Sequence, residues 1–413
     1  MKPINSSLGK ALVMLLVYEI AMLTFHLDGL SFGKLIITAL VWMSFGVAFR
    51  EFILYYDKLR NNIPIFPFLV LLLLLIWNVI NIFRAIIFDS GAITTVIGNT
   101  YTSLSLLVPF VIVFGANFST IKILNKYYHE FMKLGVVLFV CFVIVNFGLG
   151  LSDTQALIIF VLLQPVVFLI TTLQYQTKNQ KFFLLLCSVV LVYSAYIYSI
   201  RTMAIREILL YVCFVGAFLY HIFKWKWVLY VSFSALLLPF ILVQQSIVTG
   251  ESAIKKYLSS SSDDELSIDT RTFVYMELYA DLVNDGKLLI GKGANGRYYS
   301  DYFSNAEGDS PIRLNIEVGV LGLLLKGGYI AVILNLLIFI SAIWLAFFKA
   351  NNSYVLGLGY ILLVHVVLLF LENVINFSIY NFLIWVVTGL CLSTNIRELS
   401  DKQILKILRL YSI

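Results

Sequence analysis

Residues 247–313 read IVTGESAIKKYLSSSSDDELSIDTRTFVYMELYADLVNDGKLLIGKGANGRYYSDYFSNAEGDSPIR and form the only long polar segment of this sequence. Apolar runs flank it on both sides. A soluble domain carries about 25% charged residues, whereas this chain of 413 residues is 13% charged and 61% hydrophobic, with a mean hydropathy of +0.93. So apolar a chain requires lipid as its solvent. The polar segment is therefore expected to cap a membrane-embedded body.

A transmembrane helix needs about 20 predominantly apolar residues. Twelve stretches qualify, and the tenth is too long for one crossing. A break at Gly327 and Gly328 would divide it and leave a short tilted or re-entrant piece, 315–325. The twelve predicted spans are residues 9–26, 32–49, 64–83, 101–118, 132–150, 154–174, 182–200, 203–221, 227–246, 315–348, 354–371 and 374–394.

The sequence thus predicts an all-α polytopic membrane protein with four parts. Residues 1–246 hold transmembrane helices 1–9, and residues 247–314 form one large extracytoplasmic loop with short helices. Residues 315–395 hold helices 10–12. Residues 396–413 alternate apolar and basic residues at helical spacing, which predicts a cytoplasmic amphipathic tail on the membrane surface.

The distribution of Lys and Arg predicts the orientation, because cytoplasmic loops carry an excess of both. With the N-terminus inside, the predicted inner segments hold 17 of the 29 Lys and Arg residues. The short outer connections hold only Lys34, Arg84, Arg201 and Arg206. Both termini are therefore expected in the cytoplasm, and the polar segment is expected on the outer side.

Arg201 and Arg206 depart from this charge distribution. They lie in YSIRTMAIRE (residues 198–207), where the seventh predicted span ends and the eighth begins. Ionisable residues at membrane depth are costly and usually face a cavity or a partner. One interpretation is that Arg206 pairs with a nearby acid, or that both side chains extend to lipid headgroups. The other is a phosphate site, because guanidinium stays charged and its planar fork matches phosphate oxygens.

Arg271 precedes a helical pattern inside the polar segment. Apolar residues at helical spacing follow it, and Asp269 or Thr270 fits the N-cap position. The helix dipole disfavours a cation in the first turn, which suggests a use for Arg271; a solvated surface arginine is the alternative. Further on, GKGANG (residues 291–296) predicts a tight turn rather than a nucleotide site, because no helix clearly starts after it.

The end of the polar segment carries further candidates. The candidate sugar contacts are Arg297, Tyr298, Tyr299 and Arg313, and the tyrosines could equally lie at the membrane interface. Glu317 opens the tenth span, and with Asp309 it is a candidate catalytic base; an acid stabilised by the helix dipole is the alternative. The four cysteines lack metal-ligand spacing and the polar segment has no Asp-x-Asp pair. No metal and no cofactor is therefore predicted.

The chain resembles the O-antigen ligase and polymerase superfamily. Twelve spans with both ends inside, and one long outer loop before the tenth span, match that architecture over nearly the whole chain. Three short motifs within residues 199–322 match as well. They are Ser199-Ile200-Arg201 before the eighth span, Arg271 leading through an amphipathic helix to Gly291-x-Gly293, and Glu317-x-Gly319-x-x-Gly322.

The resemblance implies a metal-independent, inverting glycosyltransferase of the GT-C type acting on undecaprenyl-diphosphate-linked oligosaccharides. Arg201, Arg271 and Arg206 would bind the diphosphate, and Glu317 or Asp309 would be the base. Ligases of the family carry a functional histidine in the outer loop, whereas all four histidines of this chain lie elsewhere. This departure favours a polysaccharide polymerase (Wzy-type) in the bacterial cytoplasmic (inner) membrane, with its active site facing the periplasm or cell exterior.

Three other functions stay open, and one is that of a relative of the peptidoglycan polymerases, which favour ten spans. An O-antigen ligase would transfer the lipid-linked glycan to lipid A core or another acceptor. A lipid-linked oligosaccharide flippase would line a central path with charged residues, whereas the predicted spans carry few, namely Glu19, Lys326 and His365. The expected partners are an undecaprenyl-diphosphate oligosaccharide donor and acceptor, the lipid bilayer and a chain-length regulator. No nucleic-acid partner is expected.

Overall fold

The computed structural model is helical over most of the residues that it describes. It describes residues 4–25, 32–88, 99, 102–145, 152–197, 201–223, 225–241, 272–300, 312–314, 316, 318–373 and 375–409. The elements are α1 (Ile4–Phe25), α2 (Phe32–Leu54), α3 (Tyr56–Asn62), α4 (Ile65–Phe88), α6 (Ser103–Leu107), η2 (Val108–Ala116), α7 (Phe118–Val145), α8 (Asp153–Leu163), α9 (Pro165–Ile170), η3 (Leu173–Tyr175), α10 (Lys178–Ile197), α11 (Arg201–Phe223), α12 (Lys226–Ser234), η4 (Ala235–Leu237), α15 (Thr272–Asn284), β1 (Tyr298–Tyr299), β2 (Ile312–Arg313), α17 (Gly319–Phe348), α18 (Ser353–Leu368), α19 (Ile379–Leu392), α20 (Thr394–Arg397) and α21 (Asp401–Arg409).

This is the fold of an all-α membrane protein. Many large apolar side chains point outward, among them Ile53 and Phe182, which are 60% and 72% exposed and need lipid around them. Six shorter apolar helices accompany the long ones in the described ranges, and the count of twelve crossings stays a prediction. Among the described residues, five helices are long and apolar enough to span a membrane, over Ser7–Thr24, Ile36–Leu54, Ile65–Ile87, Phe118–Val145 and Gly319–Phe348.

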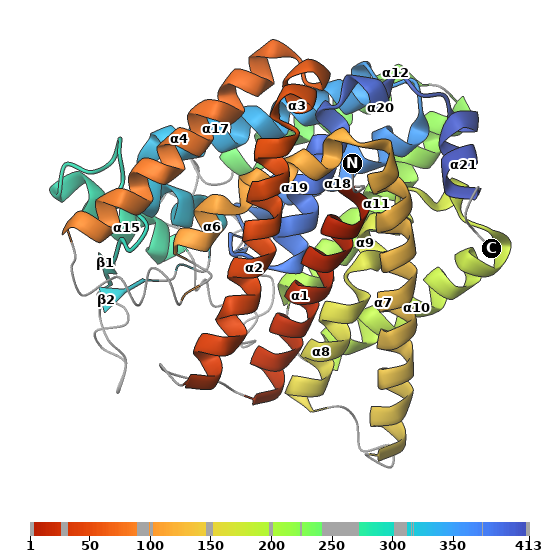
Figure 1. Ribbon diagram of the computed structural model, residues 1–413, viewed down its shortest axis with the longest axis horizontal. Helices are drawn as coiled ribbons and strands as arrows, with labels where there is room; N and C mark the ends of the chain where they lie inside the picture. The colour runs from red at the N-terminus through yellow and green to blue at the C-terminus, as the bar shows by residue number, and fades with distance from the viewer. Residues whose placement is uncertain are drawn as a thin grey trace, which may run out of the picture.

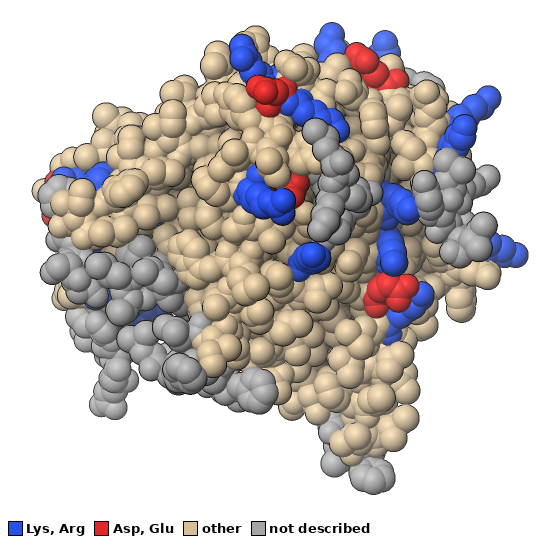
Figure 2. Space-filling view, viewed as in Figure 1, with Lys and Arg blue, Asp and Glu red and all other residues tan. Residues whose placement is uncertain are grey.

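The molecule has two distinct ends. In Figure 1, α3, α20 and α21 lie toward the top and right of the view, whereas α15, β1 and β2 lie at the lower left. Figure 2 shows Lys and Arg side chains gathered along the top and right of this face, above a broad neutral surface. We call the end with α3, α20 and α21 the basic end, and the end with α15, β1 and β2 the loop end. A neutral band beside a charged end is what a bilayer would require.

The centre of the bundle is α19. All 14 of its residues are buried, as expected for a helix that is apolar on every side. Beside it lies η2, a fully buried 3-10 helix that follows α6 where one α-helix over 101–118 was expected. The two approach closely at Gly115 and Gly389, because a Cβ on either glycine would collide with the backbone of the other helix.

Two further segments differ in detail from the expected spans. The stretch 154–174 is divided into α8 and α9 at Pro165, because proline has no N–H to continue the helix. The C-terminal tail forms α21, as its spacing predicts. This helix packs against α7 and α18 and buries Ile404 completely. Asp401 at its start accepts a hydrogen bond from the amide of Ser353 at 2.8 Å.

The long helix α17 breaks at Gly328, as the sequence predicts. Gly328 has φ 65° and ψ −167°, a conformation that is essentially restricted to glycine. A Cβ at this position would also collide with the carbonyl of Leu289. The break interrupts the hydrogen-bond ladder, so carbonyls before Gly328 and amides after it need partners from elsewhere in the chain.

Candidate functional site

The described part of the polar segment comprises a helix, the loop that follows it and a short hairpin at the loop end. Helix α15 buries Leu278 and Leu282 completely. Strands β1 and β2 pair in antiparallel fashion. The hydroxyl of Ser300, which follows β1, donates to Glu277 Oε2 at 2.6 Å and so ties the hairpin to α15. The hairpin and the helix therefore form one unit attached to the membrane body.

Two of the predicted motifs meet at residues 369–372, directly after α18. Tyr275 Oη, in the first turn of α15, donates to the carbonyl of Phe370 at 2.9 Å. The amide of Gly319, the first residue of α17, donates to the carbonyl of Glu372 at 3.0 Å. We call residues 369–372 the junction turn, because it joins the starts of two helices that are more than 40 residues apart in sequence.

The predicted charged residues themselves are described only in part. Arg271, Glu317 and Asp309 lie outside the described residues. Arg271 directly precedes α15, and Glu317 lies two residues before α17. Arg201 and Arg206 lie in the first two turns of α11, and only their backbone is described. The structure thus gives the helices that follow these residues, and the side-chain roles stay predictions.

Helix α11 runs antiparallel to α18. A Cβ on Gly216 would lie 3.3 Å from Tyr360 Oη, near the middle of both helices. Phe218, closer to the end of α11, lines a cavity together with Ser353 at the start of α18. The opposite end of α11, which begins at Arg201, is therefore directed toward the end of α18, where the junction turn lies.

The four candidate sugar contacts occupy the hairpin. Tyr298 pairs in register with Arg313, and Tyr299 pairs with Ile312. Tyr298 is only 2% exposed and packs in the apolar core, so it anchors the hairpin. Tyr299 is 50% exposed, Arg297 is exposed and Arg313 is half-buried. Because successive side chains of a strand point to opposite faces, Tyr298 is buried and Tyr299 is exposed. Of the four candidates, Tyr299 and Arg297 are therefore the exposed side chains that a ligand could contact.

The Gly-rich sequence GKGANG lies against the break in α17. Before the break, the carbonyls of Leu325 and Lys326 accept hydrogen bonds from the amides of Lys292 and Gly293, at 2.7 and 2.9 Å. Gly291 has φ +65°, and a Cβ on it would lie 2.6 Å from backbone atoms of α17. Only glycine permits this approach, so the sequence serves as a tight turn, as predicted, and docks on the broken helix.

After the break, the same loop supplies hydrogen-bond acceptors instead of donors. The amides of Tyr329 and Ile330 donate to the carbonyls of Leu288 and Leu289, at 3.1 and 3.3 Å. Irregular backbone at membrane depth is tolerated where protein covers it. The loop of residues 287–296 therefore closes the gap in α17, and we call this arrangement the clamp.

Two side chains of α4 complete the clamp. Arg84 donates from Nη1 to the carbonyl of Ile290 at 2.7 Å and from Nη2 to that of Gly291 at 2.8 Å. Trp77 Nε1 donates to the carbonyl of Gly327 at 2.9 Å. Arg84 was expected in a short outer connection, but α4 continues past it to Phe88. Its departure from the charge distribution therefore has a structural reason.

An ion-pair cluster ties the clamp to α15. Lys292 Nζ lies 2.7 Å from a carboxylate oxygen of Asp281 and 2.6 Å from one of Asp285. Burial alone would lower the pKa of Lys292, but the hydrogen bonds and charges of the two carboxylates outweigh it and raise this pKa above its usual value of 10.5. Lys292 thus bonds to α17 through its backbone amide and pairs with α15 through its side-chain ammonium group.

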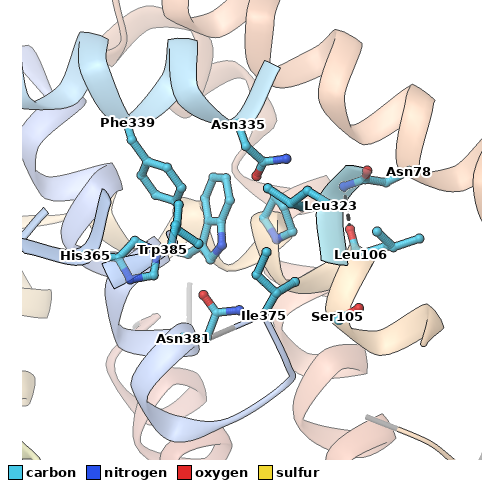
Figure 3. A pocket seen from close by; sticks show the side chains of 12 residues that line it. Asn78, Ser105, Leu106, Leu323, Asn335, Phe339, His365, Ile375, Asn381 and Trp385 are labelled. Carbon is cyan, nitrogen blue, oxygen red and sulfur yellow. Dashed lines mark hydrogen bonds between the residues drawn. The ribbon is translucent and has the colours of Figure 1, made fainter. Parts of the chain in front are cut away.

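The bundle also contains a polar cavity that sequence reasoning did not identify (Figure 3). It lies between α4, α6, α17, α18 and α19, has a volume of about 20 Å³, and can hold about one water molecule. Lys326 Nζ, which is buried, donates to Ser105 Oγ at the cavity wall at 3.2 Å. The signal in the sequence is a set of amides within apolar spans. The polar residues of the lining are Asn78, Ser105, Asn335, His365 and Asn381.

His365 was interpreted as a core histidine, and its surroundings agree with this. The side chain is 1% exposed, and its ring centroid lies 5.1 Å from that of Phe339 and 5.8 Å from that of Tyr380. The cavity beside it is far smaller than a sugar ring. In this conformation it holds water at most.

Fold and composition define the class as an all-α membrane protein. Among the described residues, no group of three or more His, Cys, Asp or Glu side chains is arranged to hold a metal ion. Comparison of the sequence with protein-family models and with curated proteins found no match.

Proposed function

We propose that this protein is a polysaccharide polymerase of the bacterial cytoplasmic membrane. It joins undecaprenyl-diphosphate-linked oligosaccharide repeat units by metal-independent inverting glycosyl transfer. The chain crosses the membrane about twelve times, has both termini in the cytoplasm and turns its loop end outward. The observation that carries the proposal is the junction turn, which is bonded to the helices that follow Arg271 and Glu317. The beginning of helix α11, at Arg201, is directed toward the same end.

The chemistry requires positive charge where the leaving group departs. A hydroxyl oxygen of the acceptor sugar attacks the anomeric carbon of the donor, and the bond from that carbon to the diphosphate oxygen breaks. The bonding electron pair leaves with the undecaprenyl diphosphate, while the hydroxyl proton passes to a carboxylate, Glu317 or Asp309. In the proposal Arg201, Arg271 and Arg206 stabilise the charge that grows on the diphosphate.

The clamp and the hairpin give this site a rigid support. The clamp fixes the segment after α15 to the broken helix α17 through four backbone hydrogen bonds. The hairpin presents Tyr299 and Arg297 from the same unit. An exposed aromatic ring and a guanidinium are suited to contact a sugar. Positioning by elements held this firmly is what a transfer between two bound lipids requires.

The proposal is tested by transfer in a defined system. The full-length protein is reconstituted into vesicles with a synthetic undecaprenyl-diphosphate oligosaccharide, and the products are resolved as a ladder by gel electrophoresis and mass spectrometry. The wild type is expected to form lipid-linked oligomers. Arg201→Ala and Arg271→Ala remove the guanidinium group and are expected to lose at least tenfold in rate. Arg271→Lys is expected to lose as much, because Lys lacks the bidentate fork. Arg60→Ala, an exposed arginine of α3, is the matched control.

The products also separate the alternatives. A ligase would form no oligomer without a separate acceptor such as lipid A core. A flippase would move the lipid-linked oligosaccharide across the vesicle membrane without forming a new covalent bond. Normal ladders from all three arginine variants would refute the assignment of the diphosphate site.

A further inference from the structure

A second cavity lies at the basic end, among α9, η3, α10, α11 and α18. Its volume of about 160 Å³ exceeds the space of a single water several times over. Its walls are of two kinds, polar on one side and apolar on the other. The lining includes Thr171, Gln174, Lys181, Phe214, Phe218 and Leu356.

The polar side lies at the level where apolar helices end. Thr171 follows the apolar helix Thr154–Ile170, and Lys181 is in the first turn of α10. Thr171 is 5% exposed, and its Oγ1 has no hydrogen-bond partner within the described ranges. A buried hydroxyl without a hydrogen-bond partner costs free energy unless a ligand or a water molecule supplies that partner. An ammonium and a donor hydroxyl at one cavity wall suit a phosphate group.

The apolar side extends from this level toward the interior. Phe214 and Phe218 are one turn apart on α11, with ring centroids 6.2 Å apart. Because α11 runs toward the basic end, Phe214 lies about 6 Å deeper than Phe218. Phe218 is 52% exposed despite its apolar ring. The cavity therefore has the polarity of an amphiphile, with charge at the boundary and an apolar path beneath it.

One carboxylate stands nearby and is already engaged. Asp401 accepts hydrogen bonds from the amide of Ser353 and from the hydroxyl of Tyr175. Burial and these contacts with Asp401 raise the pKa of Tyr175. Asp401 thus occupies the N-terminus of α18, and the charge available to a ligand in the cavity is that of Lys181.

We propose that this cavity binds an anionic phospholipid from the leaflet at the basic end. The headgroup phosphate contacts Lys181 and Thr171, and the first part of an acyl chain lies along Phe214 and Phe218. A zwitterionic lipid offers the same phosphate but adds a cation that Lys181 would repel. Charge complementarity therefore selects the anionic headgroup.

The test measures lipid binding to the full-length protein purified in detergent. The protein is titrated with phosphatidylglycerol, and separately with phosphatidylcholine of the same acyl chains, and bound lipid is counted by native mass spectrometry. Lys181→Gln is expected to weaken the tightest phosphatidylglycerol site about fivefold. Lys181→Arg is expected to retain it. Lys178→Gln is the matched control, because Lys178 is exposed in the same helical turn and does not line the cavity.

A second variant separates binding from folding. Thr171→Val keeps the side-chain shape and removes the unpartnered hydroxyl, so the lipid-free protein is expected to unfold no earlier than wild type, while phosphatidylglycerol binds about threefold more weakly. Equal losses in Lys178→Gln would overturn the site, as would phosphatidylcholine binding as tight as phosphatidylglycerol. Competition by free inorganic phosphate at the same concentration as lipid would show an anion site without a lipid, and would also refute the proposal.

Discussion

Replacing Gly328 with alanine tests whether the clamp depends on the break in α17. The new Cβ meets the carbonyl of Leu289 and occupies a φ of 65° that only glycine adopts with ease. Such backbone strain costs about 2 kcal/mol. Relieving it by moving the backbone removes the hydrogen bonds from Tyr329 and Ile330 to the loop, at about 1 kcal/mol each. Whether the strain is kept or relieved, the variant is therefore expected to lose about 2 kcal/mol of stability.

The matched control lies in the same helix. A Cβ on Gly322 would contact nothing within 4 Å, and a glycine in a helix interior destabilises it relative to alanine by about 1 kcal/mol. Gly322→Ala is therefore expected to unfold at the same temperature as wild type or higher. Thermal unfolding of both purified variants, followed by tryptophan fluorescence, gives the comparison. If Gly328→Ala unfolds together with Gly322→Ala, the break is not held by the loop and the account of the clamp fails.

Two further predictions concern the same clamp. Arg84→Lys loses the paired hydrogen bonds to Ile290 and Gly291, which is expected to lower the free energy of unfolding by about 2 kcal/mol. The exposed Arg60→Lys should leave the thermal unfolding midpoint unchanged. Equal midpoints for the two variants would contradict this prediction. Because the pKa of Lys292 is raised in the folded state, its stabilisation is present below pH 10.5 and is lost as the pH rises through the folded pKa. The difference in unfolding midpoint between wild type and Lys292→Met should therefore shrink as the pH rises above the folded pKa of Lys292. A difference that stays constant would exclude the ion pairs as its cause.

Much of the fold was predictable from local signals. The length and apolarity of the runs predicted the helices, because each lipid-exposed segment must satisfy its own backbone. Gly327 and Gly328 predicted the break in α17, since a glycine pair inside a long span is a weak point. Pro165 offered the same kind of signal for the division of α8 from α9, and the span predicted over 154–174 stays a prediction.

The candidate site was less accessible to sequence reasoning. Nothing local distinguishes Arg84, a clamp residue, from an arginine at an outer boundary, because its partner Ile290 is 206 residues away. Tyr298 and Tyr299 are adjacent and chemically identical, yet only packing decided that one is an anchor and the other is exposed. The amides that line the central cavity come from separate helices, so their convergence depends on how the helices cross.

The sequence alone determined a membrane-embedded helical body with one polar segment, because hydropathy and helical period act over short stretches of chain. Only the tertiary structure decided that this segment closes a broken helix, that α15 and α17 begin at one turn, and that a cavity of mixed polarity lies at the basic end. These features rest on hydrogen bonds and contacts between distant residues. Their free energy exists only once the bundle has packed, so no local pattern encodes them.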